Sequence, residues 1–313
     1  MIYLKINFRL ILKYFWAFYI LFNTSTNSFS QFHNQIDDVK TAADIDTILK
    51  AIPFGYNYGG IAVANPFEGK ECRMLYDSLQ IKNWVKRDFD NNGYSDLLVL
   101  STLKSFYCIL DSRGNRFYIK ELSPYSFPTS CELFYVSTKS NLINYFQNDY
   151  NQCNKQSFRK ELLVYKFDGF VEYNESQVFN KIEKIEFKYN GELSPSINVD
   201  IKTNRRMLFQ SKLFGKKTGS FYGKINKIEY QKLIDCLNYI DFSKLKYEYC
   251  VNWLHYDISH LKITYNNGQV KTINDKGSIG TFGLIRLYHL ITEITQKYSK
   301  NKIKRRTPIE ARR

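Results

Sequence analysis

A segment rich in aspartate and asparagine, residues 88–97, constrains the fold of this chain more than any other feature. Residues 81–86 before it alternate between apolar and polar side chains, and residues 96–100 at its end form a short apolar run. Alternation is typical of a half-buried strand, and a short apolar run bounded by polar residues is typical of a fully buried one. The segment therefore predicts two strands joined by a short polar loop.

The loop places side-chain oxygens at its positions 1, 3, 5 and 9 and a glycine at position 6. Ca²⁺ takes roughly six to eight oxygen ligands, and a tightly curved chain can supply most of them. We expect a structural Ca²⁺ site, because the ligand set leaves no open position for chemistry. The alternative is a solvated polar turn without a metal. The expected ligands are the side chains of Asp88, Asp90, Asn92 and Asp96 and the backbone carbonyl of Tyr94, with Gly93 at the sharp turn.

The strand–loop–strand context separates this loop from a helical EF-hand. An EF-hand carries a bidentate glutamate at position 12, where this chain has Val99. The unit instead resembles the FG-GAP and VCBS-type repeats of calcium-binding β-propellers and adhesion proteins, and the resemblance implies that Ca²⁺ stiffens a β-hairpin. Those families repeat the loop several times, whereas this chain carries one good copy. The matching residues are Asp88, Asp90, Asn92, Gly93, Asp96 and Leu97.

The N-terminus has the layout of a secretory signal peptide. Lys5, Arg9 and Lys13 form a basic region, residues 14–22 are apolar, and small residues precede Gln31. The apolar run is shorter than the ~20 residues that span a bilayer. We therefore expect residues 1–30 to be removed near Ser30–Gln31 and the mature protein, without a membrane span, to be periplasmic or extracellular. An uncleaved membrane anchor is the alternative.

The charge of the chain suggests partners only broadly. Removal of residues 1–30 lowers the formal charge from +15 to +12, because they contain three basic and no acidic residues. A basic exported protein favours an acidic polysaccharide or an anionic membrane surface. Another envelope protein is a separate candidate partner, which an exposed apolar or aromatic patch would support. A Lys- and Asn-rich composition typical of an AT-rich genome explains the charge equally well. No nucleic-acid partner is expected, and residues 300–313 are expected to form a basic tail.

Six cysteines in an exported chain permit disulfides. Cys236 with Cys250, and Cys131 with Cys153, would close short loops, and free buried cysteines are the alternative. Spacing alone does not decide among these pairings. The cysteines are Cys72, Cys108, Cys131, Cys153, Cys236 and Cys250.

The pattern of apolar residues divides the mature chain into two domains. Residues 31–177 read as a β-rich domain that opens with a helix within 31–55 and continues as short strands, with a hairpin turn at Asp168-Gly169. Residues 174–180 are a polar break. Residues 178–299 predict the order β-β-β-α-β-β-α, with Asn226 as the N-cap of the first helix. The chain is therefore expected to be α+β. The expected strands include 96–100, 105–110, 116–122, 131–136, 142–146, 161–167 and 170–173 in the first domain, and 182–189, 196–202 and 205–213 in the second.

The second domain resembles domain-of-unknown-function family 6438 over about residues 180–298. The resemblance implies an exported bacterial protein but no activity. Family members often carry a Cys-x-x-x-Cys-Pro segment where this chain has Pro195 without the cysteines. The resemblance rests on residues 220–225, Leu233, Asp241-Phe242, residues 257–265 and the glycine-containing turn before the last helix.

No catalytic motif is found in the sequence. His255 and His260 have odd spacing, so they would face opposite sides of one strand. Asp257 either caps a turn or binds a polar ligand. The sequence therefore predicts a non-catalytic, calcium-stabilised binding or structural module of the bacterial envelope. The alternatives are a hydrolase of envelope polymers that uses two carboxylates, and a protein–protein interaction module.

Overall fold

The computed structural model describes most of the chain beyond the predicted signal peptide. The described residues are 32–52, 60–67, 69–122, 131–137, 140–149, 157–176, 178–191, 196–213, 216–251 and 256–300. Residues 1–30 and 301–313, and with them the predicted leader and nearly all of the basic tail, lie outside these ranges. None of the described helices has both the length and the apolar character to cross a membrane.

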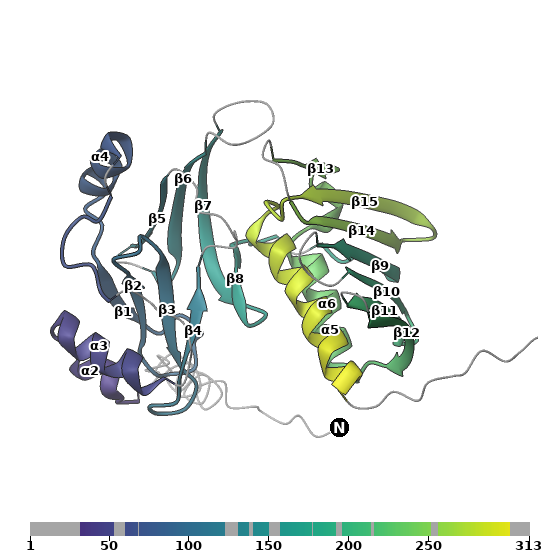
Figure 1. The fold of residues 1–313 in the computed structure, drawn as a ribbon, viewed down its shortest axis with the longest axis horizontal. Coiled ribbons are helices and arrows are strands. Elements are labelled where there is room, and N and C mark those ends of the chain that lie inside the picture. Colours follow the sequence, from purple (N-terminus) through teal and green to yellow (C-terminus); the bar gives the residue numbers. More distant parts are fainter. Residues whose placement is uncertain are drawn as a thin grey trace, which may run out of the picture.

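The described part contains short helices, three antiparallel sheets and one long C-terminal helix (Figure 1). The helices are α2 (Gln35–Asp38), α3 (Ala42–Ala51), α4 (Lys70–Ser78), α5 (Lys227–Tyr239), the 3-10 turn η1 (Phe242–Lys244) and α6 (Phe282–Lys300). The strands of the first half are β1 (Trp84–Arg87), β2 (Asp96–Leu100), β3 (Phe106–Asp111), β4 (Phe117–Glu121), β5 (Cys131–Val136), β6 (Ile143–Asp149), β7 (Ser157–Lys166) and β8 (Gly169–Glu172). Those of the second half are β9 (Ile182–Asn190), β10 (Ser196–Lys202), β11 (Arg206–Leu213), β12 (Lys216–Lys224), β13 (Glu248–Tyr249), β14 (Ile258–Tyr265) and β15 (Gln269–Lys276).

The strand order confirms the predicted α+β class. The first half contains two four-stranded antiparallel sheets, β1-β2-β3-β4 and β5-β6-β7-β8. The second half contains one sheet in the order β12-β11-β10-β9-β14-β15-β13, in which only the two-residue β13 pairs in parallel. The sequence pattern did not indicate β12, because its glycines weaken the strand signal. Backbone pairing with β11 holds this segment as a strand although its intrinsic strand propensity is low.

Helix α4 corrects the prediction that only strands follow the opening helix of the first half. Cys72 and Tyr76, one turn apart, are its buried residues, and its N-cap Gly69 offers no side-chain hydrogen bond. The helix therefore begins without the start signal that sequence reasoning looks for. A disulfide ties Cys72 to Cys131 of β5, with a Cα–Cα distance of 5.4 Å.

That disulfide also corrects both short-range cysteine pairings. Cys131 is bonded to Cys72 and so does not close a loop with Cys153. Cys236 is free and buried, so it does not bond to Cys250, and Cys108 is free and buried as well. Burial raises the pKa of the Cys236 thiol to about 12, which leaves it an unreactive core residue.

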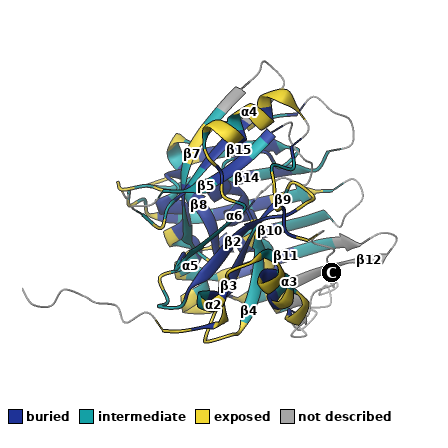
Figure 2. Cartoon of the chain, turned by 90° about the vertical axis from the view of Figure 1, so that its left-hand side faces the viewer, coloured by how far each residue is buried: buried dark blue, intermediate teal, exposed yellow. Residues whose placement is uncertain are grey.

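Strand β2 is buried on both faces, which explains its continuous apolar run. Leu97 and Val99 pack against α2 and α3, whereas Leu98 and Leu100 pack toward the second sheet and α4. All five residues of the strand are buried (Figure 2). The sheet β1–β4 is thus an inner layer, and the loop before β2 opens directly out of it.

The hairpin predicted around Asp168-Gly169 forms with its turn one residue earlier. Phe167 and Asp168 both have positive φ, 58° and 60°, and Lys166 pairs with Gly169. Gly169 is instead required for close packing, since a Cβ there would lie 2.6 Å from Cδ of Arg286 on α6. The glycine therefore marks the contact between the two halves.

Helix α6 joins the two halves through its first turn. Phe282 lies in the core of the first half, with its ring centroid 4.8 Å from that of Tyr145 and 6.3 Å from that of Phe134. The carboxylate of Glu172, at the end of β8, accepts hydrogen bonds from the backbone N–H groups of Phe282 at 2.6 Å and Gly283 at 2.8 Å. Arg286 donates from Nε to the carbonyl of Phe167 and pairs with Glu293. One helix therefore belongs to two cores.

We predict that Phe282→Ala lowers the free energy of unfolding by ~3–5 kcal/mol, the range for a buried aromatic truncated in a core. The measurement is urea unfolding followed by far-UV circular dichroism. Phe179→Ala is the control, because Phe179 is 81% exposed. Equal stability of the two variants would contradict the shared core.

Candidate metal site

The loop between β1 and β2 is closed at its base by strand pairing. Arg87 and Asp96 are the last register partners of the two strands, so the residues between them must turn back within a short span. Phe89 is 1% exposed and packs edge-to-face against Phe170, with ring centroids 6.4 Å apart. Burial of this ring fixes the backbone on which Asp88 and Asp90 lie.

Backbone turns and side-chain hydrogen bonds fix the middle of the loop. Asn91 and Gly93 have positive φ, 58° and 91°. Asp88 accepts hydrogen bonds from the backbone N–H groups of Asn92 at 3.0 Å and Gly93 at 2.9 Å. Gly93 at the predicted sharp turn is therefore explained by its φ, which glycine adopts without a steric cost.

Asp96 holds the loop against the neighbouring strand. Its Oδ2 accepts the backbone N–H of Phe89 at 2.8 Å and that of Asp90 at 3.4 Å. Its Oδ1 accepts the backbone N–H of Asp111, at the end of β3, at 2.9 Å. The side chain is fully buried. Asp96 therefore organises the loop in addition to being a candidate ligand.

The structure brings three of the predicted ligands together. Carboxylate oxygens of Asp88, Asp90 and Asp96 lie within 4.8 Å of one another, in the spacing that one cation needs. Burial raises the pKa of Asp96 to about 8, and the charge of Asp90 adds to the rise, although three backbone N–H groups oppose it. Burial also raises the pKa of Asp90 to about 6, with the charge of Asp88 adding to it. The protein alone thus compensates these negative charges incompletely, and a bound cation would fit the donor set.

The other two predicted ligands lie in the same loop in structural roles. Asn92 donates from Nδ2 to Asp90 at 3.0 Å and to the carbonyl of Asp111 at 2.6 Å, and its Oδ1 accepts the N–H of Tyr94. The ring of Tyr94 stacks on Phe32, with centroids 5.1 Å apart. Ligation by the Asn92 side chain and the Tyr94 carbonyl stays a prediction.

Sequence reasoning missed the residues that support the loop from outside. Asn141 donates from Nδ2 to the carbonyl of Asp88 at 2.9 Å, and Asp111 contacts both Asp96 and Asn92 through its backbone. These residues are far from the loop in sequence, and no local pattern signals them. Asp111 meets the loop because β3 pairs with β2 in the same sheet, and Asn141 reaches it from the segment between β5 and β6 of the second sheet.

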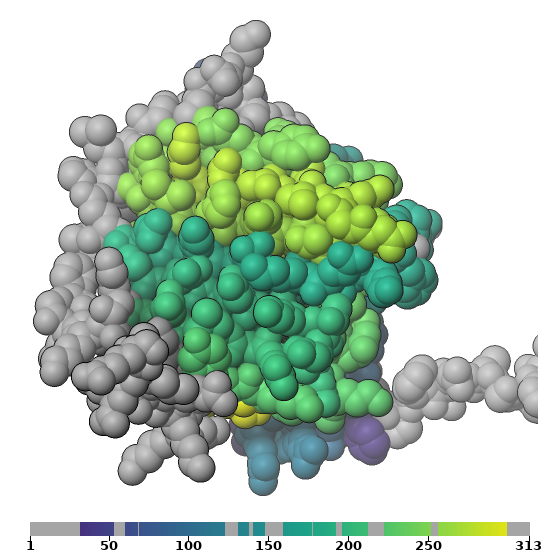
Figure 3. All heavy atoms as spheres, turned by 90° about the vertical axis from the view of Figure 1, so that its right-hand side faces the viewer, coloured from purple at the N-terminus to yellow at the C-terminus, as the bar shows by residue number. Residues whose placement is uncertain are grey.

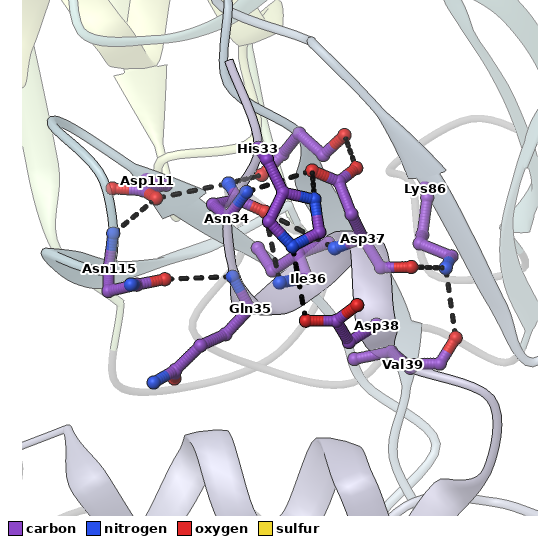
Figure 4. Close-up of polar contacts among 11 residues, drawn as sticks. His33, Asn34, Gln35, Ile36, Asp37, Asp38, Val39, Lys86, Asp111 and Asn115 are labelled. Carbon is purple, nitrogen blue, oxygen red and sulfur yellow. Dashed lines mark hydrogen bonds and ion pairs between the residues drawn. The ribbon is translucent and has the colours of Figure 1, made fainter. Parts of the chain in front are cut away.

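A second polar network secures the end of the loop to the N-terminal segment (Figure 4). Asn34 accepts the N–H groups of Ile36 and Asp37, so it caps α2. Its Nδ2 donates to the carbonyl of Ser95 at 2.7 Å and to Oδ2 of Asp111 at 3.0 Å. Asn34 is only 2% exposed, so this amide is a buried link between α2, the start of β2 and the β3–β4 turn.

The remaining candidate residues have structural partners. Asp257 accepts a hydrogen bond from the hydroxyl of Tyr189, and His260 contacts the side chain of Asn274 at 2.5 Å. His255 lies outside the described residues. The structure thus gives Asp257 and His260 local hydrogen bonds that account for their positions.

A small pocket lies where the two halves meet. Its charged residues include Lys120, Asp168 and Arg286, and its apolar wall includes Phe170 and Phe282. Asp168 is ion-paired with Lys232 and Arg286 with Glu293. These ion pairs use two of the charges of the pocket. Glu121 also lines it, and burial raises the pKa of its carboxyl group.

One comparison with known proteins gave a match. Residues 193–295 match the family model described as "Domain of unknown function (DUF6438)". This range runs from β10 into α6 and supports the resemblance of the C-terminal domain, whereas the β1–β2 loop lies outside it. A comparison with curated proteins and one with solved structures each gave no match.

The raised pKa values predict how stability depends on pH. The folded-state pKa values of Asp90, about 6, and Asp96, about 8, lie above the ordinary value of 3.8. The folded state therefore binds more protons than the unfolded state between pH 4 and 8, so stability falls as pH rises through that window. In EDTA, we expect the free energy of unfolding to decrease from pH 5 to pH 8.

The variant Asp90→Asn is expected to show a shallower decrease in a urea-unfolding series across this window. The exposed Asp235→Asn is the control and should follow the unmodified protein. Parallel curves for the unmodified protein and Asp90→Asn would contradict the assigned origin of the pH dependence.

Proposed function

We propose that this chain is an exported, non-catalytic protein of the bacterial envelope whose β1–β2 loop binds a structural Ca²⁺ ion. The observation that carries the ion is the convergence of three carboxylates within 4.8 Å at the spacing of a calcium loop. In this proposal Asp88, Asp90 and Asp96 hold the cation, and Asn92 and Tyr94 complete its oxygen ligands. The ion joins the loop more firmly to the inner sheet.

Two features support export. The N-terminal sequence has the order of charges and apolar residues of a signal peptide. The Cys72–Cys131 disulfide is of the kind that persists in oxidising compartments such as the periplasm and the cell exterior. Both features favour a location outside the cytoplasm.

The hydrogen bonds of the loop favour a structural role over catalysis. Both oxygens of Asp88 and both oxygens of Asp96 already accept backbone N–H groups. Such carboxylates are held rigidly by the chain and are poorly placed to exchange protons with a substrate. A binding or structural module, built from the β-rich half and the domain of unknown function, agrees with this arrangement.

The ion is tested by thermal unfolding of the chain from Gln31 onward, in EDTA and then in millimolar Ca²⁺ or Mg²⁺. We expect Ca²⁺ to raise the melting temperature selectively. An ion that binds only the folded state stabilises it by ~2.7 kcal/mol at a hundredfold excess over Kd. The double variant Asp88→Ala/Asp90→Ala is expected to lose the Ca²⁺-dependent rise.

The matched control is Asp38→Ala/Asp235→Ala, which removes the same charge from exposed positions. It should retain the full response to Ca²⁺. If Ca²⁺ does not raise the melting temperature of the unmodified protein, or raises it equally in the two double variants, the loop is a polar turn without a bound ion.

Export is tested separately by expressing the full chain in a bacterium and measuring the mass of the mature product. We expect a soluble periplasmic or extracellular protein that begins at Gln31. Recovery of the intact chain in the membrane fraction would indicate an uncleaved anchor instead.

A further inference from the structure

Among the residues that the structure describes, helices cover one face of the seven-stranded sheet and leave the other face open. Phe187 and Leu261 are buried on the face that packs against α5 and α6. Their sequence neighbours Glu186 and Lys262, which are register partners, point to the opposite side. Figure 3 views the molecule from this open face, where residues of β9–β11, β14 and β15 lie at the surface.

The open face is strongly basic among the residues that the structure describes. Strand register places on it seven basic side chains and three acidic ones, Glu186, Asp200 and Glu248. All three carboxylates are used within the face: Lys184 pairs with Glu186 and Asp200, Lys262 pairs with Glu186, and Lys276 pairs with Glu248. The basic residues are Lys184, Lys188, Lys202, Arg206, Lys224, Lys262 and Lys276.

Four of these cations form one row across four neighbouring strands, which we call the basic row: Lys184, Lys202, Arg206 and Lys224. Arg206 and Lys224 are direct register partners, and Lys184 is the partner of Lys202. Neighbouring strands lie ~4.8 Å apart, so the row repeats a positive charge at about that interval.

The basic row is unfavourable for the folded protein by itself. Like charges directly opposite one another destabilise a sheet. Lys202, Arg206 and Lys224 form no ion pair among the described residues, and the backbone turn between Lys202 and Arg206 adds the half-buried Arg205. Lys184, the fourth member of the row, is paired with Glu186 and Asp200. The other three cations break a local rule on an uncovered face without such a partner, which points to a role in binding.

We infer that the basic row binds an anionic polysaccharide whose carboxylates lie along the strand-to-strand direction. A sugar acid residue has a length similar to the strand spacing, so successive carboxylates can meet successive strands. Asn198 and Gln210 lie two rows away on the same face, beyond the row of Glu186, Asp200, Leu208 and Tyr222, and offer hydrogen bonds to hydroxyl groups. Tyr222, two residues from Lys224, is 53% exposed and offers an aromatic face to a sugar ring.

The same observations favour a polysaccharide over the other polyanions. A membrane surface would call for apolar side chains that insert beside the cations. The largely exposed aliphatic side chain on this face, Val270 of β15, lies two strands beyond the basic row, and the positions between the charges also include amides, hydroxyls and His260. A nucleic acid is disfavoured by the proposed export, and the inference rests on the proposed function in this respect only.

The inference is tested by isothermal titration of the chain from Gln31 onward with polygalacturonate in dilute NaCl and EDTA. EDTA removes the contribution of the calcium loop and keeps the polymer soluble. We expect binding that weakens steeply as salt is added, because counterions are released on association. Neutral dextran, a DNA duplex and phosphatidylglycerol vesicles are titrated in parallel and should bind more weakly.

The variant Arg206→Gln/Lys224→Gln is expected to bind polygalacturonate roughly tenfold more weakly, the effect of losing two exposed ion pairs. Its melting temperature should be unchanged or higher, because repulsion within the basic row is relieved. The control Lys82→Gln/Arg113→Gln removes the same charge from exposed positions of the first half and should bind like the unmodified protein.

Three outcomes would overturn the inference. They are equal losses in the two double variants, preferential binding to DNA or vesicles, and failure to bind polygalacturonate. Each leaves the calcium experiment untouched, because that experiment measures unfolding without a polymer. Failure of the Ca²⁺ response, in turn, would leave a polysaccharide site on the open face intact.

Discussion

The carboxylate of Asp96 is the interaction on which the first half of the molecule depends. It stands at the first position of β2, fully buried, and accepts backbone N–H groups from Phe89 and Asp90 at the start of the loop and from Asp111 in β3. These bonds satisfy backbone donors that would otherwise be left unpaired in the interior. The same placement raises the pKa of the group by burial. One residue therefore shapes the loop and creates the need for positive charge that a cation would meet.

The second half depends on the first through a similar interaction between a carboxylate and backbone N–H groups. Glu172 supplies a carboxylate to the N-terminus of α6, where backbone N–H groups lack helical partners. Burial raises the pKa of this carboxyl group. The two backbone N–H groups of α6 hold the carboxylate in place. Both carboxylates, Asp96 and Glu172, lie in strands of the first half, and each fixes the start of the structural unit that it contacts.

Much of the local structure could be predicted from the sequence. Strands β2, β5 and β10 have the predicted limits, and Asn226 caps α5 by accepting the N–H of Glu229 at 2.8 Å. These features depend on residues close together in the chain, where apolar period and capping chemistry are informative. Helix α4 and strand β12 were missed because tertiary contacts, a disulfide and pairing with β11, override weak local signals.

The candidate site was predictable in its ligands but not in its setting. The spacing of Asp88, Asp90 and Asp96 indicated a cluster that the structure brings together. The hydrogen bonds from Asn141 and Asp111, and the buried amide of Asn34, come from distant segments. The open face could not be foreseen either, because its charges are scattered in the sequence and only strand register aligns them.

Phe282 has a consequence for how this kind of C-terminal domain can be reused. The residue falls within the range that matches the family of unknown function, yet its ring is buried among residues of the first half. A protein that carries the same domain beside a different neighbour must cover this position with another partner or replace the phenylalanine with a polar residue. The first turn of α6 is therefore where the domain is adapted to the protein that contains it.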